Sequence, residues 1–221
     1  MIIPLNKQDI SFINELAKQR GKYYNSRWQQ NNYRKGVANS DSDDYYIERL
    51  GLYGELSMSK ILNIDIDKEI YNDGDPGYDF VYKNKKIDVK CQLYLPLDLY
   101  QNKKIFGEFY INATNKHGNL RNYKSDIIVF TSIESAKYFK DNKEIDISKK
   151  DFRLGKDKIS DTINVKIHGY IYIKDILINK EERKNYRVDI LRKNIIPKTK
   201  GNLYNFYIKE NELKQLNIKK K

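Results

Sequence analysis

Cysteine and histidine are scarce in this sequence, and their scarcity excludes several kinds of functional site. The 221 residues contain one cysteine, Cys91, and two histidines. A single cysteine can form neither an internal disulfide nor the cysteine cluster of a structural zinc site. The two histidines, His117 and His168, lie far apart in the chain, so little supports a site built on histidine-bound metal. Any chemistry must rest on other side chains.

Long apolar stretches are also missing. No segment approaches the roughly 18 consecutive apolar residues that a membrane helix requires. Residues 1–10 show no basic leader followed by an apolar segment, so we expect no secretory signal. The sequence therefore predicts an intracellular, cytoplasmic protein with no membrane partner.

Acidic residues are fewer than basic residues in this sequence. Lysine and arginine number 42 against 30 aspartates and glutamates, which gives a formal net charge of +12. Such an excess favours polyanionic partners, of which nucleic acid is the commonest in a cell. The abundance of lysine, asparagine, isoleucine and tyrosine is equally explained by an AT-rich genome. Charge therefore supports a nucleic-acid partner without establishing one.

Helical and strand patterns follow one another along the chain in an order typical of an α/β fold. Apolar residues at helical spacing predict a helix over residues 44–62, and the polar, acidic segment before it suits a helix N-terminus. Strand patterns follow at residues 79–82, 86–92, 106–113, 126–131, 165–173 and 204–208. We predict an α/β fold with a mixed central β-sheet flanked by helices.

The sequence predicts one domain with an appendage at each end. Residues 1–42 are expected to form a basic, aromatic N-terminal arm that is helical to about residue 19 and irregular beyond it. Residues 43–215 form the domain, within which residues 141–161 are charged and poor in apolar side chains, as in a loop or polar insertion. Residues 216–221 form a lysine-rich tail.

The segment from Asp79 to Lys90 alternates as a β-hairpin does. With Asn84 and Lys85 at the tip, Asp79 faces Lys90 across the hairpin. Side chains alternate between faces along each strand, so Asp79, Asp88 and Lys90 share one face. The apolar side chains Phe80, Tyr82, Ile87 and Val89 share the other, which can pack into a core. A shift of the register by two residues preserves this sorting, and a shift by one destroys it.

Two carboxylates and a lysine on one face of a hairpin suit phosphodiester hydrolysis. Carboxylates close together raise each other's pKa unless a cation lies between them. Mg²⁺ prefers oxygen ligands and often uses only one or two protein carboxylates beside phosphate oxygens. A neighbouring lysine can orient the attacking water or stabilise negative charge on phosphate.

Three short motifs in this order resemble the PD-(D/E)xK nuclease superfamily. They are Gly-x-x-Gly-Glu at residues 51–55, Gly-Tyr-Asp-Phe at 77–80 and Ile-Asp-Val-Lys at 87–90, and the resemblance covers roughly residues 44–175. It implies a restriction-endonuclease-like core. One departure is that Tyr78 stands where the superfamily's motif has proline before the first aspartate.

The resemblance also implies roles for single residues. Asp79, Asp88 and the Val89 carbonyl would bind the metal, Lys90 would be the catalytic lysine, and Glu55 would approach the same metal from a helix. Gly51 and Gly54 would let that helix lie close to the sheet. Gln92, two residues after Lys90, would touch substrate or the attacking water.

Two basic segments are candidates for nucleic-acid contacts. The first interleaves cations with aromatic side chains and contains Arg20, Lys22, Arg27, Arg34 and Lys35. Such a mixture suits phosphate contacts and base stacking, and it equally suits an amphipathic arm that packs its aromatics on the domain. The second segment contains Lys116 and His117, where an ordinary surface histidine is the alternative.

The sequence as a whole predicts a Mg²⁺-dependent nuclease, with Mn²⁺ as a substitute, that acts on DNA as an endonuclease. A Holliday-junction resolvase, an RNA-directed nuclease of the same fold and a catalytically inactive DNA-binding module remain open as alternatives. A homodimer is compatible with cutting two strands.

Overall fold

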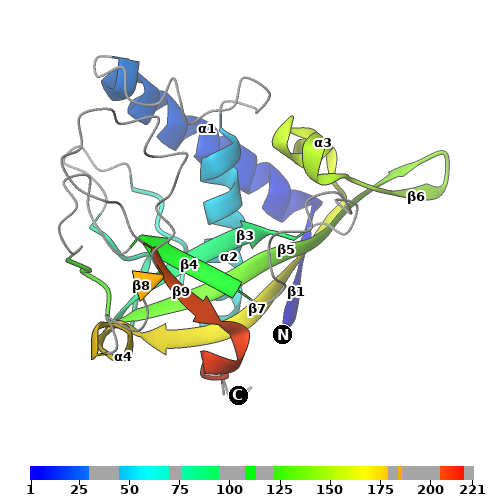
Figure 1. Ribbon diagram of the computed structural model, residues 1–221. Coiled ribbons are helices and arrows are strands. Elements are labelled where there is room, and N and C mark those ends of the chain that lie inside the picture. Colours follow the sequence, from blue (N-terminus) through cyan, green and yellow to red (C-terminus); the bar gives the residue numbers. More distant parts are fainter. Residues whose placement is uncertain are drawn as a thin grey trace.

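The computed structural model describes residues 1–29, 45–69, 76–94, 108–112, 122–178, 184–185 and 205–216. The described part contains two β-sheets, and helices cover one face of the larger sheet (Figure 1). The prediction of an α/β fold with a mixed sheet flanked by helices is therefore confirmed.

The larger sheet is mixed because one of its strand pairs is parallel. Its strands lie in the order β1-β7-β5-β3-β2, and β6 pairs with the far end of β5. β3 and β5 run parallel, while the other pairs are antiparallel. The strands are β1 (Ile2–Asn6), β2 (Phe80–Tyr82), β3 (Lys85–Leu93), β5 (Ile127–Lys140), β6 (Lys143–Asp146) and β7 (Thr162–Tyr172).

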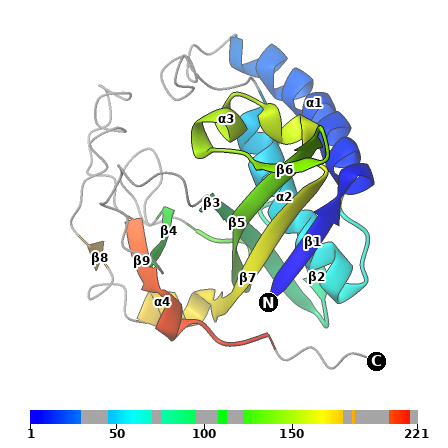
Figure 2. The ribbon, with the colours of Figure 1, turned by 90° about the vertical axis from the view of Figure 1, so that its right-hand side faces the viewer.

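Two helices, α1 (Lys7–Gln29) and α2 (Tyr46–Leu62), lie on the same face of this sheet (Figure 2). α2 agrees with the predicted helix and ends at Asn63, which adopts a left-handed conformation with φ of 53°. α1 extends beyond residue 19, through part of the segment expected to be irregular, and β1 before it was not predicted. No helix within the described ranges is long and apolar enough to cross a membrane.

A second, three-stranded sheet lies on the opposite face. Its order is β4-β9-β8, with bounds β4 (Glu108–Asn112), β8 (Lys184–Asn185) and β9 (Asn205–Lys209). Phe109 of β4 contacts Phe130 of β5 with ring centroids 4.8 Å apart. The expectation that β4 and β9 belong to one central sheet was therefore wrong. Their pairing joins strands almost a hundred residues apart, and a local pattern does not encode which strand is the partner.

Residues 141–161 are ordered secondary structure rather than the expected loop. They form β6, the helix α3 (Lys149–Arg153) and the 3-10 helix η1 (Lys156–Ile159). Asp157 of η1 is fully buried and binds Arg49 of α2 through two hydrogen bonds of 2.7 and 2.9 Å. This buried pair anchors the charged segment to the helix layer. Two short helices, α4 (Ile173–Ile178) and η2 (Glu210–Glu212), follow β7 and β9.

Candidate functional site

The β2–β3 hairpin that carries the candidate site turns one residue earlier than expected. Lys83 and Asn84 form the turn with φ of 48° and 61°, and Phe80 faces Ile87. The predicted tip at Asn84 and Lys85 was wrong by one position, which offsets the pairing by two residues. A two-residue turn with both φ values positive matches the twist of the flanking strands, and the alternation of side chains does not specify which two residues form it.

The offset leaves the sorting of side chains intact, because it is even. Phe80, Ile87 and Val89 are buried, in the same cluster as Met58 of α2. Asp88 is partly exposed and Lys90 is exposed. The apolar face of the hairpin therefore packs beneath α2, as predicted, while the charged side chains of β3 point the other way.

Asp79 lies just before β2 and is fixed against the edge of β3. Its backbone N–H donates to the Ile87 carbonyl at 2.7 Å. One of its carboxylate oxygens, Oδ2, accepts from the Val89 N–H at 2.6 Å. The carboxylate thus occupies the position beside β3 where the β2 ladder has ended.

Three carboxylates influence one another at this position. Burial raises the pKa of Asp79 well above its usual value, and the carboxylates of Glu55 and then Asp88 raise this pKa further. The Val89 N–H and Lys90 act in the opposite direction. Glu55 comes from α2 and Asp88 from β3, so residues from three elements meet at Asp79.

Lys90 accompanies the acidic residues on the exposed face of β3. Its Nζ lies 2.7 Å from Oδ1 of Asp88, and 46% of its side chain is exposed, against 13% for Asp88. The two residues are separated by two positions, so the alternation of the strand puts them side by side. The ammonium group is consequently held next to the carboxylates while it stays accessible from solvent.

Glu55 reaches the site because α2 approaches the sheet closely at Gly54. A Cβ on Gly54 would lie 2.7 Å from Oγ1 of Thr131 and 2.9 Å from Cβ of Cys91. The expectation of close approach is confirmed for Gly54. It was wrong for Gly51, whose Cβ would meet only Oε1 of Glu55, at 3.8 Å.

Arg20, predicted to contact nucleic acid, lies beside Glu55. Its Nη1 is 3.6 Å from Oε2 of Glu55, and its Nη2 donates to the Asp67 carbonyl at 2.7 Å. Both charged side chains are largely buried, with 14% and 11% exposed. Arg20 therefore joins α1 to the acidic group.

The other predicted site residues are less informative. Gln92 is partly buried on β3, two positions beyond Lys90. Lys22 and Arg27 fall on α1, but their side chains are outside the described part of the structure. The remaining predicted nucleic-acid contacts also lie outside the described residues: Arg34, Lys35, Lys116 and His117.

The donor set around Asp79 suits a hard divalent cation. Within the described ranges, no group of three or more histidine, cysteine, aspartate or glutamate side chains meets the geometry of a metal site. Mg²⁺ does not require such a group, since it is commonly held by one or two carboxylates together with phosphate oxygens. Asp79, Asp88 and the Val89 carbonyl fit that pattern, since Asp79 is hydrogen-bonded to Ile87 and Val89, on either side of Asp88.

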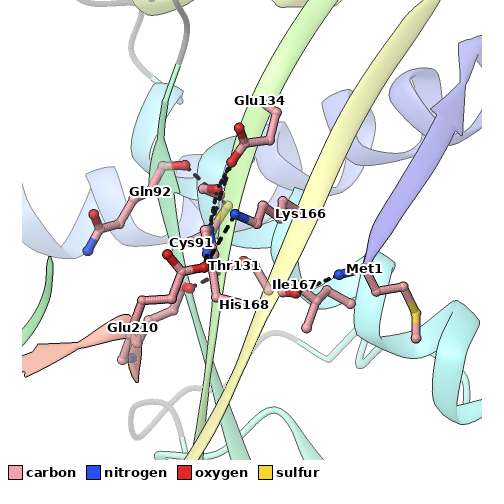
Figure 3. Close-up of polar contacts among 11 residues, drawn as sticks. Met1, Cys91, Gln92, Thr131, Glu134, Lys166, Ile167, His168 and Glu210 are labelled. Atoms are coloured by element: carbon pink, nitrogen blue, oxygen red, sulfur yellow. Dashed lines mark hydrogen bonds and ion pairs between the residues drawn. The ribbon is translucent and has the colours of Figure 1, made fainter. Parts of the chain in front are cut away.

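A second polar cluster surrounds His168 on β7 (Figure 3). Its Nε2 lies 2.7 Å from Oγ of Ser132, and its Nδ1 lies 2.7 Å from Oε1 of Glu210. Ser132 also contacts Glu134, and Lys166 contacts Glu210. His168 lies within the strand that the sequence predicted over residues 165–173. Its partners were missed because no local pattern connects β7 to η2.

Serine, histidine and glutamate in this order also occur in hydrolases with a serine nucleophile. Ser132 has no exposed surface, however, and only 5% of the His168 side chain is exposed. A substrate has no access to a hydroxyl buried this way. The cluster is therefore a link between β5, β7 and η2, and the hairpin site is the stronger candidate for chemistry.

Comparisons of the chain with known protein families, with curated proteins and with solved structures give no match.

Proposed function

We propose that this protein is a divalent-metal-dependent nuclease, with DNA as its substrate and internal phosphodiester bonds as its target. The observation that carries the proposal is the position of Asp79, hydrogen-bonded to the residues on either side of Asp88, whose carboxylate contacts the accessible Lys90. Buried carboxylates that raise one another's pKa form a site for a cation, and a lysine next to them suits a phosphate substrate. The net charge of +12 supports a polyanionic substrate.

Each side chain has a role that follows from its contacts. Asp79, Asp88 and the Val89 carbonyl would hold Mg²⁺, for which Mn²⁺ would substitute. The bound ion would supply positive charge for the phosphate and activate water for attack. The Val89 N–H keeps the Asp79 carboxylate in place, and Arg20 does the same for Glu55.

Lys90 acts from the exposed side of the site. Its ammonium group, 2.7 Å from Asp88, can donate hydrogen bonds to a phosphate oxygen and to the attacking water. Because about half of the side chain is exposed, Nζ can move from the carboxylate towards a substrate without disturbing the core.

The proposal has three further parts. The order of helix, acidic hairpin and following strands supports a restriction-endonuclease-like core. The single cysteine, which can form no internal disulfide, supports a reducing, cytoplasmic location. Cutting both strands of a duplex requires two sites, which supports a homodimer.

A cleavage assay on linear duplex, supercoiled, single-stranded and four-way-junction DNA, with an RNA duplex beside them, tests the proposal. We expect cleavage with Mg²⁺ or Mn²⁺ and none in EDTA. Asp88→Asn and Lys90→Ala should each reduce the rate at least about a hundredfold, as expected when a group that stabilises transition-state charge is lost.

The matched control exchanges the same residue types away from the site. Asp146→Asn and Lys140→Ala lie at the β5–β6 hairpin, where both side chains are exposed, and should leave the rate unchanged. Activity that survives EDTA would overturn the mechanism. Binding of nucleic acid without cleavage of any substrate would instead indicate an inactive binding module.

A further inference from the structure

Two lysines outside the predicted site contact the two residues that precede Asp79. Lys86 lies on β3 two positions before Asp88, so it projects from the same face as Asp88 and Lys90. Lys124 lies in the segment that leads into β5. Both side chains are exposed. Along β3, Asp88 therefore has Lys86 two positions before it and Lys90 two positions after it. The two lysines are separated by roughly 13 Å of strand.

Lys86 is fixed at both its backbone and its side chain. Its N–H donates to Oδ2 of Asp126 at 2.8 Å, and its carbonyl accepts from the Asp126 N–H, also at 2.8 Å. Its Nζ lies 5.0 Å from the centroid of the Tyr78 ring, within the range of a cation–π contact. Tyr78 immediately precedes Asp79, so the ammonium group of Lys86 is held against the residue next to the proposed metal ligand.

Lys124 is placed by a glycine that precedes the same aspartate. Gly77 has φ of +84°, which side chains rarely adopt. A Cβ there would lie 3.3 Å from both Cβ and Cδ of Lys124, so the lysine's alkyl chain lies directly over Gly77. Gly77 therefore positions Lys124, and Tyr78 positions Lys86. The next residue along the chain is Asp79, the proposed metal ligand.

The geometry points to Lys86 and Lys124 as a clamp for the phosphate backbone of a nucleic-acid strand that passes Asp79. This inference rests on the proposed function and names how the substrate is held there. Lysines act as point charges on phosphates and carry no information about base sequence. The face of Tyr78 is already covered by Lys86, so phosphate contact is favoured over base stacking at this position.

Another pair of exposed lysines provides a comparison. Lys140 and Lys143 face each other at the tip of the β5–β6 hairpin and are also exposed. If Lys86 and Lys124 were merely solvated charges, both pairs would contribute equally to the attraction of a polyanion. A clamp predicts that only the pair beside Asp79 binds a phosphate directly.

The experiment measures the binding of a fluorescent DNA duplex and of the corresponding single strand by anisotropy, in EDTA, between about 50 and 200 mM salt. The double variants K86Q/K124Q and K140Q/K143Q remove the same charge. We expect the first to weaken binding about tenfold or more at the lowest salt. The slope of log K against log salt should become shallower by roughly 0.9 for each duplex phosphate that the protein no longer neutralises. The second variant should leave the slope unchanged.

Equally weakened binding in both double variants, or unchanged binding in both, would overturn the clamp, provided that circular dichroism shows both variants folded. The test does not depend on catalysis, because EDTA removes the metal. If no metal supports cleavage but K86Q/K124Q still weakens binding selectively, the nuclease proposal fails and the clamp stands. If cleavage is metal-dependent and K86Q/K124Q binds normally, the clamp fails and the nuclease proposal stands.

Discussion

The proposed site depends on Asp79, whose surroundings disfavour the ionised form of its carboxyl group. Burial and the carboxylates of Glu55 and Asp88 all favour its protonated form. One backbone hydrogen bond, from Val89, offsets part of this effect. Ionisable groups with a strongly shifted pKa are commonly found where a protein binds a cation or performs chemistry, because the arrangement that function requires can lower stability.

The variant Asp79→Asn should therefore stabilise the metal-free protein at neutral pH. The folded pKa of Asp79 is raised above its unfolded value, so ionisation disfavours the fold, and stability falls as pH rises from the unfolded pKa through the folded one. Asparagine keeps the acceptor for the Val89 N–H without the charge. Thermal unfolding at several pH values checks this: the gain should be largest at neutral pH and should vanish in acid, where Asp79 is protonated in both states.

Asp146→Asn provides the control for that measurement, since Asp146 is exposed and lies on β6 away from the site. A melting temperature for Asp79→Asn below that of the wild type at neutral pH would contradict the prediction.

Glu134 belongs to the cluster around His168, in which close polar contacts outnumber the protons available to form hydrogen bonds. Burial lowers the pKa of His168, and the hydrogen bond to Glu210 offsets part of this effect, so the neutral ring with one proton is favoured. That proton and the Ser132 hydroxyl proton serve three contacts of 2.5, 2.7 and 2.7 Å. One of these three contacts therefore has no proton and brings two hydrogen-bond acceptors together.

Glu134→Gln should supply the missing proton from its amide and stabilise the protein by about 1 kcal/mol, the usual net value of one hydrogen bond. Chemical denaturation at neutral pH measures the change. Glu134→Ala removes the same charge without a donor and should give a smaller gain. Equal effects of the two substitutions would show that charge alone matters.

At the scale of elements, the close approach of α2 to β3 and β5 decides whether Glu55 reaches Asp79. The contact depends on Gly54, where any side chain would collide with Thr131 and Cys91. Arg49, on the same helix, is bound by Asp157, so α2 is also held by the charged segment 141–161. Both contacts fix the position of the helix relative to the sheet.

Gly54→Ala should destabilise the protein by roughly 1–3 kcal/mol, because the added methyl group overpacks the contact. Gly51→Ala is the matched control on the same helix. Its Cβ meets only an ordinary contact, so the higher helix propensity of alanine should stabilise by up to about 1 kcal/mol. Denaturant unfolding of both variants checks the pair. The same sign of change at both positions would contradict the described packing.

At the scale of the whole molecule, the candidate site lies near one end of the larger sheet. Helices α1 and α2 cover one face, and the second sheet covers part of the other, where Phe109 meets Phe130. β2 is a three-residue edge strand, and the proposed site begins just before it. The Lys90 side chain is exposed, so among the described residues neither layer closes over it.

Metal binding should be visible as stabilisation of the whole molecule. A ligand that binds only the folded state at a hundred times its Kd adds about 2.7 kcal/mol. For a chain of this size that raises the melting temperature by roughly 5–10 °C. Thermal shift with Mg²⁺ or Mn²⁺ measures this, and Asp79→Asn should abolish it. An equal shift in the variant would indicate binding elsewhere.

The sequence by itself determined the elements whose pattern is local. The helical spacing of residues 44–62 and the alternation of β2 and β3 predicted α2, the hairpin and the separation of Asp88 and Lys90 from the buried face. An even offset of the register could not change that separation, because the side-chain period of a strand is two.

Tertiary structure alone decided which distant groups meet. Arg20 with Glu55, Arg49 with Asp157 and His168 with Glu210 join elements that no short pattern relates. The separate second sheet is of the same kind. Such contacts form only when the whole core packs, since burial of apolar side chains throughout the chain must offset the entropy of closing the intervening loops.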